Sequence, residues 1–131
     1  MTKDKKIKIL VPTAGTEPAR KNVKYVVNIA KRLRADLLAL HIHVPGEEKP
    51  DKNCLEIFYE EGEKAGVPVW RVMWQGGIEK AIIMAAQKEG ADLIIMGASK
   101  DKVVADWMSS NVAKRANTPV VIIPGLGKEY V

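Results

Sequence analysis

The chain lacks several features that mark secreted, membrane or nucleic-acid-binding proteins. It has one cysteine, Cys54, so it can form no internal disulfide, which fits a reducing compartment. Aromatic residues make up only 5% of the sequence and leave few rings for stacking on bases. The longest apolar runs, such as Leu37–Leu40 and Leu93–Met96, are far shorter than the roughly 20 residues that a membrane span requires. We therefore expect no membrane span.

Size and charge favour one globular domain. An apolar fraction of 47% in 131 residues suffices for one core, so we expect a single domain over residues 1–131. The net charge is +5, but basic residues alternate with acidic ones along the chain, and the densest basic run is Lys3–Lys8. This pattern favours a solvated surface over a nucleic-acid interface. Only the short run Ile7–Val11 follows the charged start, so we expect no signal peptide and a cytoplasmic protein.

Apolar runs alternate with helical patterns along the chain. The runs that predict strands are Ile7–Val11, Leu37–Ile42, Val67–Trp74, Leu93–Met96 and Pro119–Ile123. The residues that recur at helical spacing between them are Val23, Val26, Val27, Ala30 and Leu33; Leu55, Phe58, Tyr59 and Gly62; Ile78, Ala81, Ile82 and Ala85; and Val104, Met108, Val112 and Ala116. Parallel strands need crossover helices, so this order predicts an α/β fold, an open five-stranded parallel sheet with helices on both faces.

Helix ends can be assigned from capping residues. Thr16 offers a hydroxyl for the first amides of a helix and Pro18 fits its first turn, so we expect the first helix to begin there. Gly66 and Gly90 follow the second and third helical patterns, where glycine accepts the left-handed conformation that ends many helices.

Five short segments together match a known sequence pattern. They are Ile9–Thr16, Leu40–Ile42, Gly77, Asp92–Gly97 and Thr118–Ile123. In this order and at these separations, the chain resembles the universal stress protein family over nearly its whole length. The resemblance implies a Rossmann-like sheet of the adenine nucleotide alpha hydrolase type, a role in stress response, and dimerisation through the last strand.

The resemblance also implies a nucleotide site whose motif is altered in this chain. Nucleotide-binding members carry an aspartate after the first strand, where this sequence has Ala14, and a methyl group cannot accept a hydrogen bond from the ligand. Their phosphate loop reads Gly-x2-Gly-x9-Gly-Ser/Thr. Counted forward from Gly97, the second glycine is Lys100 and the final pair is Ser110-Asn111. Counted back from Pro119, the final pair is instead Asp106-Trp107.

Either register weakens the phosphate site. Lysine, aspartate and tryptophan adopt positive φ angles less readily than glycine does, so the backbone cradle is not expected to form. Asp106 would also cap the amides of the following helix. A carboxylate about 4 Å from a phosphate opposes it by roughly 4 kcal/mol at an effective dielectric near 20. The sequence therefore predicts that standard ATP binding is absent.

A rearranged loop is the alternative to this interpretation. Hydroxyl and ammonium groups between the fourth strand and the last helix, including Lys102, suit an anion, although they equally suit a solvated loop and a helix cap. Other candidates match positions that line the family's nucleotide pocket. The candidate cofactor-binding residues, for ATP or AMP, are Pro12, Thr13, Ala14, Ile42, Met96, Gly97, Ser99, Lys100, Ser109 and Ser110.

Other chemistry has little support in the sequence. His41 and His43 lie two apart on a strand and so share a face, but only Cys54 or Asp51 offers a third metal ligand, through a loop. No nucleophile with a base and an orienting group stands out. Trp74 lies where a ligand could stack, although packing is the more common use of such a ring. We expect no metal and no enzymatic activity.

The last strand predicts a partner. Its residues Val120, Val121, Ile122 and Ile123 are apolar and would form an exposed sheet edge unless another chain covers them. The sequence thus predicts a homodimeric regulatory module of the stress-response type that contacts an unknown protein or small ligand. The alternative is a nucleotide-binding switch that holds ATP or AMP with a rearranged loop.

Overall fold

The computed structural model describes residues 6–13, 20–43, 45–46, 53–97 and 110–123. The strands are β1 (Lys8–Thr13), β2 (Asp36–His43), β3 (Val69–Gln75), β4 (Leu93–Gly97) and β5 (Val120–Ile123). The helices are α1 (Arg20–Leu33), α2 (Asn53–Ala65) and α3 (Ile78–Glu89), and residues 110–116 are also helical. Strands and helices alternate as the sequence predicts.

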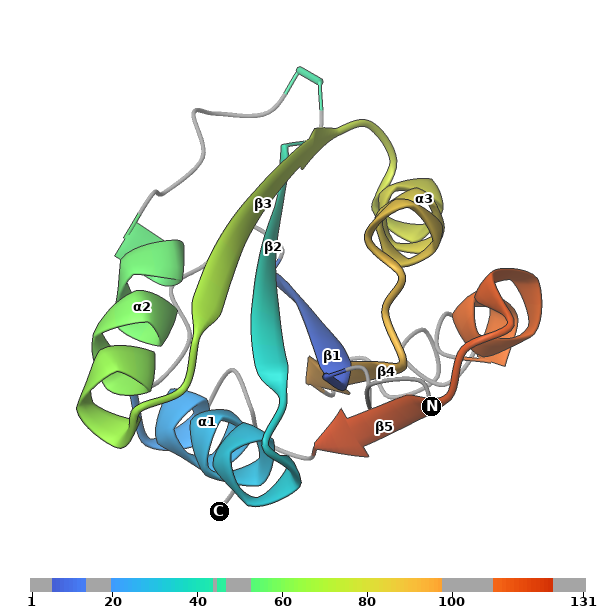
Figure 1. Ribbon diagram of the computed structural model, residues 1–131. Helices are drawn as coiled ribbons and strands as arrows, with labels where there is room; N and C mark the ends of the chain where they lie inside the picture. The colour runs from blue at the N-terminus through green and yellow to red at the C-terminus, as the bar shows by residue number, and fades with distance from the viewer. Residues whose placement is uncertain (1–5, 14–19, 44, 47–52, 98–109, 124–131) are drawn as a thin grey trace, which may run out of the picture.

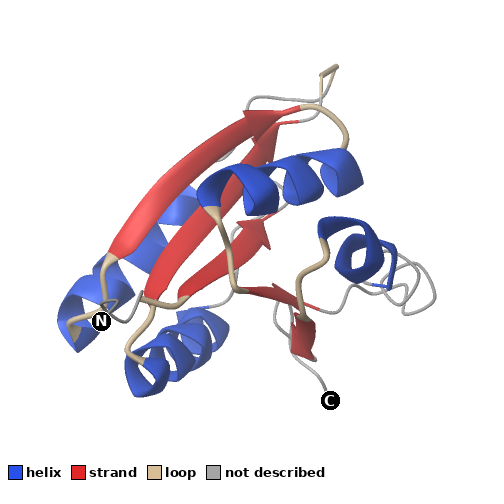
Figure 2. Ribbon diagram, turned by 45° about the vertical axis from the view of Figure 1, so that its right-hand side comes forward, coloured by secondary structure: helices blue, strands red, loops and turns tan. Residues whose placement is uncertain are grey.

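The five strands form one parallel sheet in the order β3-β2-β1-β4-β5 (Figure 1). Helices α1 and α2 lie on one face, and α3 and the helical residues 110–116 lie on the other (Figure 2). The direction in which successive strands are added to the sheet reverses at β1. Strands β2 and β3 extend from one side of β1, and β4 and β5 extend from the other. The predicted open α/β sheet is confirmed, and its topological switch point lies between β1 and β4.

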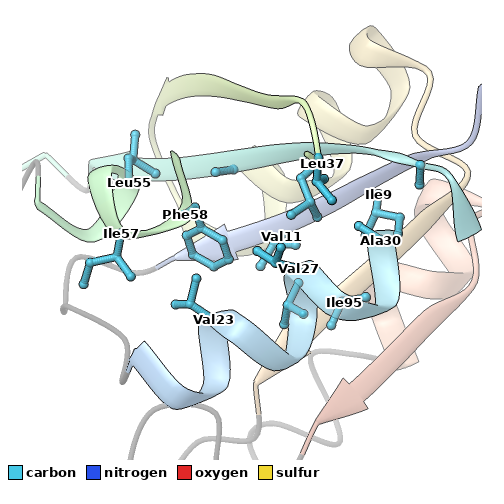
Figure 3. Packing of buried hydrophobic residues seen from close by; sticks show 14 of the residues in the cluster. Ile9, Val11, Val23, Val27, Ala30, Leu37, Leu55, Ile57, Phe58 and Ile95 are labelled. Atoms are coloured by element: carbon cyan, nitrogen blue, oxygen red, sulfur yellow. The ribbon is translucent and has the colours of Figure 1, made fainter. Parts of the chain in front are cut away.

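Each face of the sheet has its own apolar core. Alternation along β1 directs Ile9 and Val11 toward α1 and α2, and Leu10 toward α3. On the first face, Phe58 of α2 is 1% exposed and points toward Val23 and Val11 (Figure 3). The central strands are therefore buried on both faces, as their continuous apolar runs indicate.

Two glycines end helices as expected. Gly66 follows α2 with φ +76°, and Gly90 caps α3 with φ +68°, its N–H donating to the carbonyl of Ala86. Val67, expected to begin the third strand, instead donates its N–H to the carbonyl of Gly62. It therefore belongs to the end of α2, and β3 begins at Val69. The expected first-helix start, Thr16 and Pro18, lies outside the described residues.

Two residues assigned to buried helix faces are exposed. Leu33 is 43% exposed because the apolar cluster along α1 ends at Ala30, one turn before the helix does. Tyr59 is 40% exposed, and its ring lies against the guanidinium of Arg71, 4.9 Å from the ring centre. In the fourth pattern, Val112 and Ala116 are buried, whereas residues 104 and 108 lie outside the described part of the chain.

An ionic cluster joins α1 to α2. Arg20 donates from Nη1 to Glu61 Oε2 at 2.6 Å and from Nη2 to Glu60 Oε1 at 3.1 Å, and Lys64 Nζ lies 3.4 Å from Glu61 Oε2. The Glu61 side chain is 5% exposed. The hydrogen bond from Arg20 holds the pKa of Glu61 below its ordinary value, although burial acts in the opposite direction. The carboxylate is therefore stabilised in its charged form.

Glu61→Gln should destabilise the protein near neutral pH, because it replaces the buried, charged acceptor of the Arg20 guanidinium by a neutral amide oxygen. The pKa of Glu61 is lower in the folded state, so its stabilising contribution is complete above the ordinary pKa of 4.5 and disappears as the pH falls through the folded value. The stability gap between parent and variant should therefore narrow in acid. Urea unfolding across the pH range measures this difference in the free energy of unfolding. The control is Glu63→Gln, at an exposed site on the same helix, which should show no such pH-dependent difference from the parent.

Candidate functional site

The pairing of β1 with β4 stops before either strand ends. Paired residues are Ile9 with Leu93 and Leu10 with Ile94, yet β1 continues to residue 13 and β4 to residue 97. On its other side, β1 stays paired with β2 as far as Thr13. The interruption lies at the switch point, where open α/β sheets bind their ligands.

Pro12 explains why the ladder ends there. Lys8 turns both backbone groups toward β4, since its N–H donates to Asp92 Oδ2 at 2.9 Å and its C=O accepts from the Asp92 N–H at 2.8 Å. Backbone direction alternates along a strand, so Leu10 and Pro12 also face β4. Pro12 has no N–H and cannot donate the next ladder bond. Pro12 thus ends the pairing of β1 with β4 before the carboxyl ends of the two strands, where a ligand would enter.

The described candidates lie on two faces of the sheet. Ile42 and Met96 belong to the cluster beneath α3, and Ile42 is 4% exposed. Alternation places Pro12 on that face and Thr13 on the opposite one, where Thr13 is paired with His41. The structure therefore brings Pro12, Ile42 and Met96 to one side and separates them from Thr13.

The hydroxyl of Thr13 has a structural role. It donates to the carbonyl of Leu40 at 3.0 Å, and the side chain is 8% exposed. This bond fixes the end of β1 against β2. The described strand ends consequently present mainly apolar side chains, which suit a flat apolar group better than a phosphate.

Most of the predicted anion loop lies outside the described residues. Ala14, Ser99, Lys100 and Ser109 belong to this part, as do residues 102, 106 and 107. Gly97 is the last residue of β4 and pairs with Ile123. Ser110 is exposed at the first described position of the following helix. These residues therefore stay a predicted site.

The histidine pair lies at the carboxyl end of β2. His41 is 1% exposed and His43 is half-buried. Asp51 and the side chain of Cys54 fall outside the described part of the chain. Among the described side chains, no group of three or more histidine, cysteine, aspartate or glutamate residues is placed to hold a metal ion. No described helix is both long and apolar enough to cross a bilayer.

The last strand lies at one edge of the sheet, as predicted. β5 pairs with β4 alone among the described strands, through Ile94 with Val120 and onward to Gly97 with Ile123. Val121 is 42% exposed, whereas Ile123 is 7% exposed. An exposed β-branched side chain on an edge strand is a feature that a partner chain would cover.

Comparison with known proteins gives consistent matches. The sequence model of the universal stress protein family matches residues 46–124. Universal stress protein MJ0531 of Methanocaldococcus jannaschii is 27% identical over 144 aligned positions, which cover 93% of this chain and 84% of that protein.

Solved structures share the fold. A universal stress protein crystallised in complex with cAMP superimposes with a TM-score of 0.72 at 22% identity, covering 91% of this chain and 97% of the other. A universal stress protein family member of Arabidopsis thaliana with AMP bound gives 0.66 at 15% identity, covering 90% and 91%.

Proposed function

Because this chain belongs to the universal stress protein family, we propose that it is a homodimeric regulatory module that has lost standard ATP binding. The altered nucleotide-binding motif carries the proposal: Ala14 stands where nucleotide-binding members have an aspartate, and no glycine follows Gly97 at the spacing of their phosphate loop. We further propose that residues 1–131 form a single domain that acts in the cytoplasm by contacting other molecules and not by catalysis.

The chemistry of the described strand ends supports this proposal. Pro12, Ile42 and Met96 are apolar, and the Thr13 hydroxyl already donates to Leu40. A triphosphate needs several converging N–H or cationic donors. These side chains offer none, so anion contacts would have to come from other residues, such as those of the altered segment 98–109 and Ser110.

A nucleotide-binding switch is the second candidate function. The relatives crystallised with cAMP and with AMP favour it, because both share this fold. In that case Ser99, Lys100, Ser109 and Ser110 would supply the anion contacts in place of the glycine cradle. Those contacts need not suit ATP and would better suit a monophosphate, which carries fewer charges.

Thermal unfolding with millimolar ATP and Mg²⁺, AMP or cAMP separates the two functions. A nucleotide present at 100 times its dissociation constant adds about 2.7 kcal/mol to the free energy of unfolding. We expect no shift with any of the three, while the AMP-bound Arabidopsis relative serves as the positive control. A saturable shift would establish the switch and end the proposal of lost binding.

The proposed dimer is tested at β5. Val121→Lys or Ile122→Lys should raise the monomer fraction in sedimentation velocity, because each places an ammonium group in an apolar edge contact. Met84→Lys is the matched control, since Met84 on α3 is also 42% exposed and lies away from β5. If both β5 variants sediment as the parent does, the dimer does not form through this strand.

A further inference from the structure

The opposite edge of the described sheet is formed by β3. β3 pairs only with β2 among the described strands and lies at the outer end of the sheet (Figure 1). The Leu37 N–H donates to the carbonyl of Pro68, and the Gly76 N–H donates to the carbonyl of His43. Even-numbered residues from 68 to 76 thus direct their backbone groups to β2. The outward backbone groups belong to Val69, Arg71, Met73 and Gln75.

This edge strand is nearly palindromic. Its sequence, Val-Trp-Arg-Val-Met-Trp-Gln, has Val72 at the centre and a tryptophan two residues away on each side. Trp70 is 59% exposed, and Met73 on the other face of the strand is 55% exposed. Exposed apolar side chains on both faces of an open edge strand are a feature that soluble proteins usually avoid.

The face beneath α3 is hollowed beside this edge. A shallow groove of about 620 Å³ runs along β3, with Leu38 and Val72 among its lining residues and Trp70 and Trp74 on the same strand. The Lys88 ammonium lies 5.8 Å from the ring centre of Trp74. The groove therefore lies on the face of β3 that carries both tryptophans.

We propose that β3 pairs antiparallel with β3 of a second copy of this chain, centred on Val72. In that register the outward backbone groups of Arg71 meet those of Met73 in the second copy, and Val69 meets Gln75. Each such pair exchanges two hydrogen bonds. Trp70 of each copy lies opposite Trp74 of the other on the groove face, and cross-strand aromatic pairs stabilise sheets.

Charge also fits a second copy in this register. Arg71 lies opposite an uncharged methionine, and its guanidinium already pairs with Glu56 of its own chain. A shift of the centre by one residue to Arg71 would place the two arginines opposite each other and each Trp70 opposite a valine. Only the register centred on Val72 pairs both tryptophans and the full length of Val69–Gln75.

A cysteine at the centre reports this register directly. Val72→Cys in a Cys54→Ser background places two thiols at a pair whose Cα atoms lie about 4.5 Å apart. A disulfide spans Cα separations of about 4.4–6.8 Å. Gln75→Cys in the same background is the control, because Gln75 is exposed on the same edge but lies about 20 Å from its counterpart in this register.

Under mild oxidation of the full-length protein, Val72→Cys should form a disulfide-linked dimer at least about tenfold faster than Gln75→Cys, since only the first pair meets the geometry of the bond. Equal rates, or a faster reaction at the more exposed position 75, would overturn the proposal. Val121→Lys in both proteins removes the proposed β5 contact, so the result does not depend on the dimer of the proposed function.

A second measurement requires no new cysteine. In the Val121→Lys background, Trp70→Thr should lower the dimer fraction in sedimentation velocity, because it removes both cross-strand aromatic pairs. Met84→Thr replaces an exposed apolar residue outside this edge and should leave the fraction unchanged. A monomeric Val121→Lys protein at all concentrations would show that β3 does not pair with itself and would leave this edge to a different protein.

Discussion

Phe58→Ala should lower the free energy of unfolding by about 3–5 kcal/mol, the range typical of a phenylalanine removed from a packed core. Phe58 is the only phenylalanine of the chain and is 1% exposed. Its ring lies where α2 meets α1 and the sheet, pointing toward Val23 and Val11 (Figure 3). Alanine would leave a cavity between three elements whose backbones cannot all move inward.

Urea unfolding followed by circular dichroism measures this effect. Tyr59→Ala is the matched control, because Tyr59 is the next residue of the same helix and is 40% exposed. We expect that control to cost less than about 1 kcal/mol, mainly through the lost contact with Arg71. Equal losses in the two variants would mean that Phe58 is not a core residue of the folded protein in solution.

Much of this fold can be predicted from local patterns. The apolar runs of β1, β4 and β5 are each bounded by charges, glycine or proline, and the run of β2 begins directly after Asp36. Their positions need no tertiary information. Gly66 and Gly90 end helices because the left-handed conformation is accessible to glycine. The parallel direction of the strands then follows from the alternation of strands and helices.

Contacts between distant elements cannot be predicted in this way. Arg20 and Glu61 lie 41 residues apart, and no periodicity relates them. Leu33 and Tyr59 fit their helical stripes in the sequence, but they are 43% and 40% exposed in the structure. Helical spacing shows which residues share a face and does not show how far the neighbouring element extends.

The candidate site is only partly encoded in recognisable residues. Pro12 is visible in the sequence, but its effect depends on which neighbour its missing N–H faces, and that follows from the contacts of Lys8 with Asp92. At β3 the sequence shows tryptophans at equal distances on both sides of Val72. This symmetry matters for strand pairing because the order of the strands places β3 at an edge of the sheet. The sequence alone does not show that order.

Gly62→Ala should destabilise the protein even though alanine is the better helix former. In a helix interior, alanine is favoured over glycine by about 1 kcal/mol. At this position, however, a Cβ atom would lie 2.3 Å from Val69 Cγ2 and 2.9 Å from the carbonyl oxygen of Val67. Overpacking of this kind typically costs about 1–3 kcal/mol, so the steric term should exceed the gain in propensity.

A double-mutant cycle separates these two terms. Val69→Ala removes the Cγ2 atom that the new methyl group would meet, so Gly62→Ala should cost less in that background than in the parent. The rescue should be partial, because the carbonyl of Val67 is a backbone atom and stays in place. Urea unfolding of the four proteins gives the coupling energy. If Gly62→Ala instead stabilises the parent protein, α2 does not approach β3 as closely as this packing requires.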